Sequence, residues 1–111
     1  MLSVSVVLPT FNERENIGIV IPRIHETLAS RPHEVIVVDD DSPDGTAEAV
    51  TELAKDAPWL RLIIRKGPRG LGTALTEGYD AAVCDVIGSM DADLSFECSD
   101  ILRLVERVES G

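Results

Sequence analysis

A chain of 111 residues is long enough for one domain with a single modest hydrophobic core. Its net charge of −10 excludes the basic surface by which nucleic-acid-binding proteins contact phosphates, so we expect no nucleic-acid partner. No apolar run reaches the ~20 residues that cross a membrane, and the first residues lack the features of a signal peptide, so we expect a cytoplasmic protein.

In the first half of the chain, two apolar runs alternate with two helical patterns. A strand is predicted over residues 3–8, where β-branched residues run up to a proline that ends the strand. Asn12 with Glu15 three residues later resembles the capping pair of a helix N-terminus, and an apolar stripe at helical spacing follows. Residues 34–38 form a second apolar strand, and Ser42 followed by a proline predicts the start of a second helix.

The second half repeats this order. Residues 60–64 predict a third strand, and residues 70–83 a helix with Tyr79 on its buried face. Residues 86–90 predict a fourth strand, and Ser99 is expected to cap the last helix. Continuous apolar strands that alternate with amphipathic helices predict an α/β fold, with alternating β-α units, a mostly parallel sheet and helices on both of its faces.

Polar sequences follow three of the strands: F-N-E-R-E after the first, D-D-D-S-P-D-G after the second and D-A-D-L-S after the fourth. Ligands bind at the carboxyl ends of the strands in open α/β sheets, so we expect these loops to form one site. Asp91 and Asp93 offer hard oxygen ligands that suit Mg²⁺ or Mn²⁺. Magnesium usually completes its shell with phosphates and water, which implies a diphosphate ligand, although aspartates are also common in solvated turns.

The first two loops carry groups that suit a nucleoside. A carboxylate after the second strand can accept hydrogen bonds from a ribose hydroxyl or a base N–H, and Phe11 lies where a base can stack on it. We assign Asp39 and Asp44 to structural roles. The glycine-rich sequence at residues 67–73 opens a helix whose N-terminus and nearby cations, Arg65 among them, favour an anion, and a simple flexible connection is an equal alternative.

Four motifs together are more specific than any one of them. The sequences L-P-T-F-N-E-R-E-N-I, V-V-D-D-D-S-P-D-G-T, G-L-G-T-A and M-D-A-D-L-S, in this order and spacing, resemble family 2 glycosyltransferases with the GT-A fold. Within that family they most resemble the dolichyl-phosphate (polyprenyl-phosphate) mannose synthases. The resemblance implies that residues 1–111 form one nucleotide-sugar-binding α/β domain, the N-terminal half of a GT-A (Rossmann-like) nucleotide-diphospho-sugar transferase.

The resemblance also implies a role for particular residues. Asp91 and Asp93 would be the catalytic pair of the D-x-D motif, with Asp93 a ligand of Mg²⁺ or Mn²⁺ and Ser95 a further metal contact. The positions that the resemblance assigns to the nucleotide sugar, typically GDP-mannose, are Pro9, Phe11, Glu13, Val38, Asp40, Asp91, Ala92 and Asp93.

The implied reaction is transfer of a hexose, mannose by resemblance, from the nucleotide sugar to a polyprenyl or dolichyl phosphate, with inversion and with help from the metal. The acceptor lies in a membrane, so the resemblance also implies peripheral association with the cytoplasmic membrane face. Phe96, Glu97 and Cys98 depart from the family, which usually continues with histidine and a nearby proline. The family's catalytic domain is also longer than this chain.

Two other interpretations remain open at this stage. One is a truncated donor-binding half-domain with little or no transferase activity. The other, less well supported, is a receiver-like α/β module whose aspartates gather around Mg²⁺. An open sheet edge beside the fourth strand would favour dimers or larger assemblies, so we also expect the chain to self-associate.

Overall fold

Strands and helices alternate along the chain in the structure, a computed structural model that describes residues 1–68, 70–93 and 98–110. The described elements are β1 (Val4–Thr10), α1 (Arg14–Thr27), β2 (His33–Asp39), α2 (Thr46–Ala54), β3 (Leu60–Ile64), α3 (Leu71–Ala81), β4 (Val86–Ser89) and α4 (Cys98–Glu109). None of the described helices is both long and apolar enough to cross a membrane.

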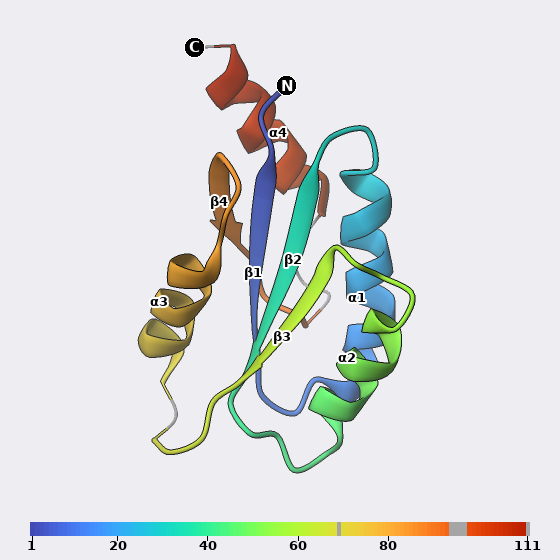
Figure 1. Cartoon of the computed structure of the whole chain (residues 1–111), viewed down its shortest axis with the longest axis vertical. Helices are drawn as coiled ribbons and strands as arrows, with labels where there is room; N and C mark the ends of the chain where they lie inside the picture. Colours follow the sequence, from blue (N-terminus) through green and yellow to red (C-terminus); the bar gives the residue numbers. More distant parts are fainter. Residues whose placement is uncertain (69, 94–97, 111) are drawn as a thin grey trace.

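The four strands form one parallel sheet in the order β3-β2-β1-β4. Helix α3 covers one face of this sheet, and α1, α2 and α4 pack on the other face (Figure 1). The predicted parallel sheet with helices on both faces is therefore confirmed. All four strands run in the same direction, so the loops that follow them meet at one end of the molecule.

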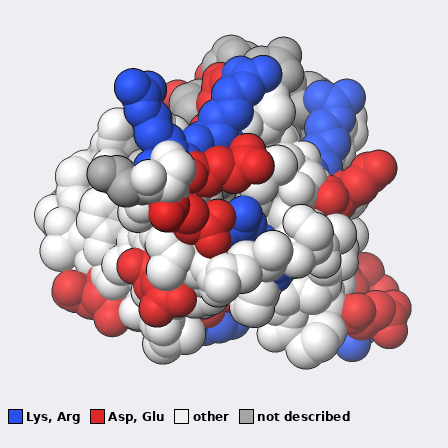
Figure 2. All heavy atoms as spheres, turned by 90° about the horizontal axis from the view of Figure 1, so that it is seen from above, with Lys and Arg blue, Asp and Glu red and all other residues white. Residues whose placement is uncertain are grey.

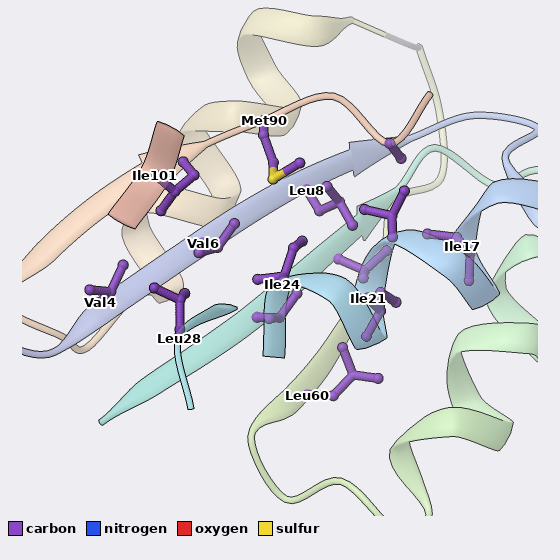
Figure 3. Packing of buried hydrophobic residues seen from close by; sticks show 14 of the residues in the cluster. Val4, Val6, Leu8, Ile17, Ile21, Ile24, Leu28, Leu60, Met90 and Ile101 are labelled. Atoms are coloured by element: carbon purple, nitrogen blue, oxygen red, sulfur yellow. The ribbon is translucent and has the colours of Figure 1, made fainter. Parts of the chain in front are cut away.

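The larger core lies between the sheet and α1, α2 and α4. Ile17, Ile21 and Ile24 recur at helical spacing along α1, are almost completely buried, and face apolar residues of β1 (Figure 3). Burial of one such side chain is worth about 1.5–3 kcal/mol, so this stripe holds α1 on the sheet. Met90, directly after β4, points into the same core and is 5% exposed (Figure 3).

A smaller core lies under α3, where the helix approaches the sheet closely. Ala74 and Gly78 are its buried residues, and a Cβ atom on Gly78 would lie 2.2 Å from Cγ1 of Val7 in β1. The prediction that Tyr79 packs in the core is wrong, because its side chain is 40% exposed and its hydroxyl donates to Ser89 Oγ at 3.1 Å. Glycine, not tyrosine, sets the distance between α3 and the sheet.

Strand β1 runs through Pro9 to Thr10, so the prediction that the proline ends the strand is wrong. Alternate residues of a parallel strand direct their backbone groups to opposite neighbours. The carbonyl of Val7 accepts a hydrogen bond from the β4 side, and that of Thr10 accepts one from Asp40 on the β2 side. Pro9 therefore faces the β4 side, where the pairing has ended at Val7, and its missing N–H costs no ladder hydrogen bond.

Helix α1 begins at Arg14, and the predicted Asn12–Glu15 capping pair does not form. Asn12 instead has a left-handed φ of 56°. The amide groups at this helix start donate to side chains of the loop after β2 and of the first residue of α2: Asn12 N–H to Ser42 Oγ at 2.9 Å, Glu13 N–H to Thr46 Oγ1 at 3.1 Å and Arg14 N–H to Asp44 Oδ2 at 3.2 Å. The segment after β2 thus caps α1, the helix that follows the loop after β1.

Helix α2 begins at Thr46 and not at Ser42 as predicted. The Ser42 hydroxyl donates to Asp39 Oδ1 at 2.6 Å, and its N–H donates to Asp39 Oδ2 at 2.9 Å. Because Asp39 holds Ser42 in the loop, Ser42 does not cap the helix. Helix α4 also begins one residue before its predicted cap, at Cys98.

Candidate functional site

The loops after β1 and β2 and the start of α3 enclose a pocket of about 310 Å³. Asp40 follows β2 directly and contributes a carboxylate to this pocket, and Phe11, after β1, contributes a ring that is 37% exposed. We call it the Asp40 pocket; its lining residues are Pro9, Thr10, Phe11, Asp40, Gly70, Leu71 and Ala74. Three of the residues assigned to the nucleotide, Pro9, Phe11 and Asp40, are therefore brought together.

The aspartates of the acidic run point to opposite faces of the sheet. Asp39 is completely buried and accepts hydrogen bonds from Ser42 and from the Thr10 hydroxyl at 2.7 Å. Asp40 lies on the α3 side, and its Oδ1 accepts a hydrogen bond from Arg65 Nη1 at 2.8 Å. Asp39 thus builds the loop, in agreement with its assignment to structure, and Asp40 faces the pocket.

Asp44 also serves the loop. Its Oδ1 accepts hydrogen bonds from the hydroxyl and the N–H of Thr46. The hydrogen bond from the Thr46 hydroxyl is the main reason that the pKa of Asp44 lies below its ordinary value. A carboxylate with these bonds stays ionised and keeps the first residues of α1 and α2 in place.

A second pocket, of about 200 Å³, adjoins the first. The two share Pro9 and Leu71, which form the wall between them. We call the second one the Asp91 pocket; it is lined by Pro9, Leu71, Leu75, Ser89, Met90 and Asp91. Together the pockets form a continuous surface from the end of β2 to the end of β4.

Asp91 and Asp93 are both exposed at the end of β4, whereas Ala92 between them is 3% exposed and packs in the larger core. With the alanine anchored, Asp91 lines the Asp91 pocket and Asp93 lies at the surface two residues further on. Two carboxylates suit Mg²⁺ or Mn²⁺, which often take one or two from the protein and the rest of their shell from phosphates and water. Within the described residues, no group of three or more His, Cys, Asp or Glu side chains could hold a metal.

Four of the predicted residues that the structure describes are not among those that line these pockets, namely Glu13, Val38, Ala92 and Asp93. Glu13 is the N-cap residue of α1, and its Oε2 accepts a hydrogen bond from Asn16 at 3.0 Å. Val38 is completely buried under α3. Ser95 lies outside the described residues.

Leu71 is a site residue that no sequence pattern indicated directly. This side chain is 61% exposed at the first position of α3 and lines both pockets. The glycine-rich sequence that precedes α3 was the available signal, because it placed a helix start at this end of the sheet. Arg65 was one of the cations expected to favour an anion at this helix start. In the structure it is paired instead with the carboxylates of Asp40 and Glu77.

The opposite end of the molecule, which carries both termini (Figure 1), is built of mixed charges. Acidic and basic side chains are interspersed on this face (Figure 2). Arg31 Nη2 lies 2.9 Å from Glu109 Oε1, and Glu109 Oε2 accepts a hydrogen bond from Leu2 N–H at 2.8 Å. These bonds, that of Arg31 first, lower the pKa of Glu109 and tie the start of the chain to the end of α4.

The model of the family described as glycosyl transferase family 2 matches residues 5–111. The chain belongs to this family. The match excludes the receiver-like interpretation and confirms the resemblance inferred from the four motifs.

Curated members of the family are similar to the chain over nearly all of its length. A dolichol-phosphate mannosyltransferase of Pyrococcus furiosus is 41% identical over 110 residues, which cover 99% of this chain and 31% of that protein. A polyprenol monophosphomannose synthase of Mycolicibacterium smegmatis is 37% identical over 110 residues, which cover 96% of this chain and 41% of that protein. The chain thus spans less than half the length of these relatives.

Solved structures of glycosyltransferases share the fold. A mannosyltransferase from Pyrobaculum calidifontis, solved in complex with GDP-mannose and Mn²⁺, superposes with a TM-score of 0.70 at 35% identity, over 81% of this chain and 27% of that one. Glucosyl-3-phosphoglycerate synthase from Mycobacterium tuberculosis, solved with Mn²⁺, UDP and glucosyl-3-phosphoglycerate, gives 0.80 at 25% identity, over 99% of this chain and 40% of that one. The predicted GT-A-like α/β fold is therefore confirmed.

Proposed function

We propose that this chain provides the donor-binding part of a metal-assisted, inverting glycosyltransferase. The enzyme would transfer a hexose from a nucleoside-diphosphate sugar to a polyprenyl phosphate. The observation that carries the proposal is the continuous surface of the Asp40 and Asp91 pockets, which has a carboxylate and an aromatic ring at one end and the carboxylate of Asp91, the first aspartate of the D-A-D sequence, at the other.

The nucleoside would occupy the Asp40 pocket. Phe11 offers a partly exposed ring on which a base can stack, and Asp40 offers a carboxylate oxygen to a base N–H or a ribose hydroxyl. Pro9 and Leu71 would pack on either side of the ribose as the ligand passes into the Asp91 pocket. The mannose-specific relatives and the structure with GDP-mannose favour guanosine and mannose as the natural pair.

Asp91 and Asp93 would hold the divalent cation against the diphosphate. When bound, Mg²⁺ or Mn²⁺ neutralises the charge that develops on the departing nucleoside diphosphate. The main contribution of the protein is to fix these two carboxylates and the donor in one orientation, since orientation lowers the barrier of a displacement. The buried Ala92 supports this role because it anchors the backbone between them.

A polyprenyl phosphate is already an anion at neutral pH, so the attack on the anomeric carbon needs no general base. A single in-line displacement then forms the bond from the phosphate oxygen to the sugar, breaks the bond to the nucleoside diphosphate, and inverts the anomeric centre. The names of the relatives support a polyprenyl acceptor. A membrane partner at the cytoplasmic face belongs to the same proposal.

Donor binding without transfer is the second candidate. The chain spans only 31% and 41% of the two curated relatives described above, and both pockets of the proposed site serve the donor. An assay of mannosyl transfer to a polyprenyl phosphate, run beside donor binding, separates the two functions.

Calorimetric titration of the chain with GDP-mannose, with and without Mn²⁺, tests the proposal. We expect Mn²⁺-dependent binding that Asp93→Ala weakens by about 10- to 100-fold or more, since even an outer-shell partner of a metal contributes that much. Asp56→Asn, which alters an exposed aspartate after α2, is the matched control and should bind like the unaltered chain. A folded chain that binds no nucleotide sugar in the presence of Mn²⁺ would contradict the proposal.

A further inference from the structure

Arg65 lies directly after β3, and its largely buried guanidinium contacts both the loop after β2 and the start of α3. Its side chain is 11% exposed. Within the described part of the chain, its four polar contacts are Nη1 to Asp40 Oδ1 at 2.8 Å, Nη1 to Gly70 C=O at 3.1 Å, Nη2 to Thr73 Oγ1 at 2.7 Å and Nε to Glu77 Oε1 at 3.4 Å. One side chain therefore joins two walls of the Asp40 pocket.

The number of donors on Arg65 shows how it can act. A guanidinium has five N–H donors. Within the described residues, Nη1 donates two hydrogen bonds and Nη2 donates one, and Nε lies 3.4 Å from Glu77 Oε1 in an ion pair. Arg65 is therefore committed to the protein and is a poor candidate for a direct ligand of a diphosphate.

The bond to Arg65 makes the two oxygens of Asp40 unequal. Oδ1 accepts the 2.8 Å charge-assisted bond, while the contact that the structure gives Oδ2 is a 3.4 Å one with Gly70 N–H. Such a long contact leaves Oδ2 with most of its acceptor capacity. The Asp40 side chain is 12% exposed and lines the pocket.

We propose that Arg65 is the positioning residue for nucleobase recognition: by holding Asp40 Oδ1 and the first turn of α3, it presents one acceptor oxygen to a base N–H. The inference rests on the proposed function and specifies its ligand. The ligand must carry an N–H donor on its base, as guanine and uracil do. Loss of Arg65 should weaken the base-dependent part of binding and leave the metal-diphosphate part intact.

The chain contains a matched control for this ion pair. Arg61 lies four residues earlier on the same face of β3 and pairs with Glu34 of β2 at 2.6 Å. Glu34 also accepts hydrogen bonds from Ser5 Oγ at 2.6 Å and Val83 N–H at 2.9 Å, at the far end of the sheet from both pockets. The Arg61 side chain is more exposed, at 42% against 11% for Arg65, and its removal tests what the loss of a second arginine–carboxylate pair between these strands does to the fold alone.

The experiment is calorimetric titration of the full chain and its Arg65→Gln and Arg61→Gln variants with GDP, UDP and pyrophosphate, each with Mn²⁺. We expect Arg65→Gln to lose about tenfold or more in affinity for the nucleotide that the unaltered chain prefers, since the hydrogen bond from the base to the Asp40 carboxylate is charge-assisted. Its affinity for pyrophosphate should not change, and Arg61→Gln should bind all three like the unaltered chain.

Two milder variants keep the inference testable where Arg65→Gln disturbs folding. Arg65→Lys retains the charge but not the fork that reaches Gly70 and Thr73, so its affinity should be intermediate. Thr73→Val removes one of the acceptors that orient the guanidinium and should weaken nucleotide binding by a smaller factor. In an Asp40→Asn background, Arg65→Gln should have little further effect on nucleotide affinity, because Arg65 acts through that carboxylate.

The outcomes separate the inference from the function on which it rests. An equal loss of pyrophosphate affinity in Arg65→Gln, or nucleotide binding that Arg65→Gln leaves unchanged, would overturn the inference alone. The inference would also be overturned if Arg61→Gln lost as much nucleotide affinity as Arg65→Gln. If the unaltered chain bound neither GDP nor UDP, both the proposed function and this inference would be wrong.

Discussion

The imidazole rings of His25 and His33 share a hydrogen bond of 2.8 Å between Nδ1 and Nε2. His33 Nδ1 lies 2.9 Å from the carbonyl of Arg31, which can only accept, so in the neutral pair His33 donates there and its Nε2 accepts from His25. The His25 ring also stacks on Trp59, with centroids 3.9 Å apart. Burial first, and then repulsion from His33, lower the pKa of His25.

This lowered pKa predicts that stability falls in mild acid. The folded chain binds a proton at His25 less readily than the unfolded chain, in which the pKa of a histidine is about 6.5. His25 therefore contributes its full stabilisation above the pKa of the unfolded chain. This stabilisation is lost as the pH falls from that pKa toward the lower pKa of the folded chain. Urea unfolding at a series of pH values, followed by the fluorescence of the single tryptophan, should show this loss.

His25→Phe is the variant that isolates the effect. It can keep the stacking on Trp59 but cannot titrate, so its stability should vary less between pH 7.5 and 5 than that of the unaltered chain. The carboxylates titrate equally in both proteins and cancel in the comparison. Parallel stability curves for the two proteins over this range would show that His25 is not the group responsible.

Contacts between individual side chains could not be predicted from the sequence. His25, His33 and Trp59 lie in different segments, and only the packing of α1 beside the sheet brings them together. Asp40 could be chosen within its acidic run by the family resemblance, but its partner Arg65 comes from another strand. Burial of side chains over long separations in the chain decides such pairs, and no local pattern encodes them.

Helix α3 is held closer to the sheet than a side chain at Gly78 would allow. Alanine there would gain helix propensity of about 1 kcal/mol. Its Cβ would, however, lie 2.2 Å from Cγ1 of Val7, which is completely buried. The helix would have to move, so we expect Gly78→Ala to destabilise the fold by about 1–3 kcal/mol. Because α3 begins at the wall between the two pockets, nucleotide affinity should fall as well.

Gly18→Ala provides the control, since Gly18 lies in α1 with open space where its Cβ would be. This variant should be stabilised by about 0.5–1 kcal/mol. Adding Val7→Ala to Gly78→Ala should remove the clash, so that the double variant loses less stability than the two single changes added together. Urea unfolding of these four variants and of the unaltered chain decides; equal effects of the two glycine substitutions would contradict the close approach.

The elements themselves were predictable and their ends were not. Apolar runs and helical spacing located all eight described elements, because burial on both faces of a parallel sheet imposes those patterns. The predicted start of α2 was wrong because Asp39 holds Ser42 in the loop, and that of α1 was wrong because its cap is not local. Ser42, Asp44 and Thr46 bond to the segment before α1, and a pattern read along one segment cannot include a cap that another loop supplies.

At the scale of the molecule, β4 is an open edge of the sheet. In the described part of the chain it pairs with β1 alone, so its outer backbone groups face away from the sheet. Ile87 in this strand is 43% exposed. A short edge strand with an exposed apolar side chain can pair with the same strand of a second copy. The net charge of −10 on each copy opposes this contact.

The balance between pairing at the β4 edge and charge repulsion between copies predicts that self-association of the chain depends on salt. Salt shortens the range of the repulsion between copies, to about 10 Å at 0.1 M, without weakening apolar contacts. Sedimentation velocity at micromolar concentrations should therefore give a mass that rises with both protein and salt concentration. Ile87→Lys should abolish the association by placing a cation on the edge, whereas Ile19→Lys, at an equally exposed position on α1, should not. A monomer at every concentration and salt, or equal effects of the two lysines, would show that the edge of β4 does not pair.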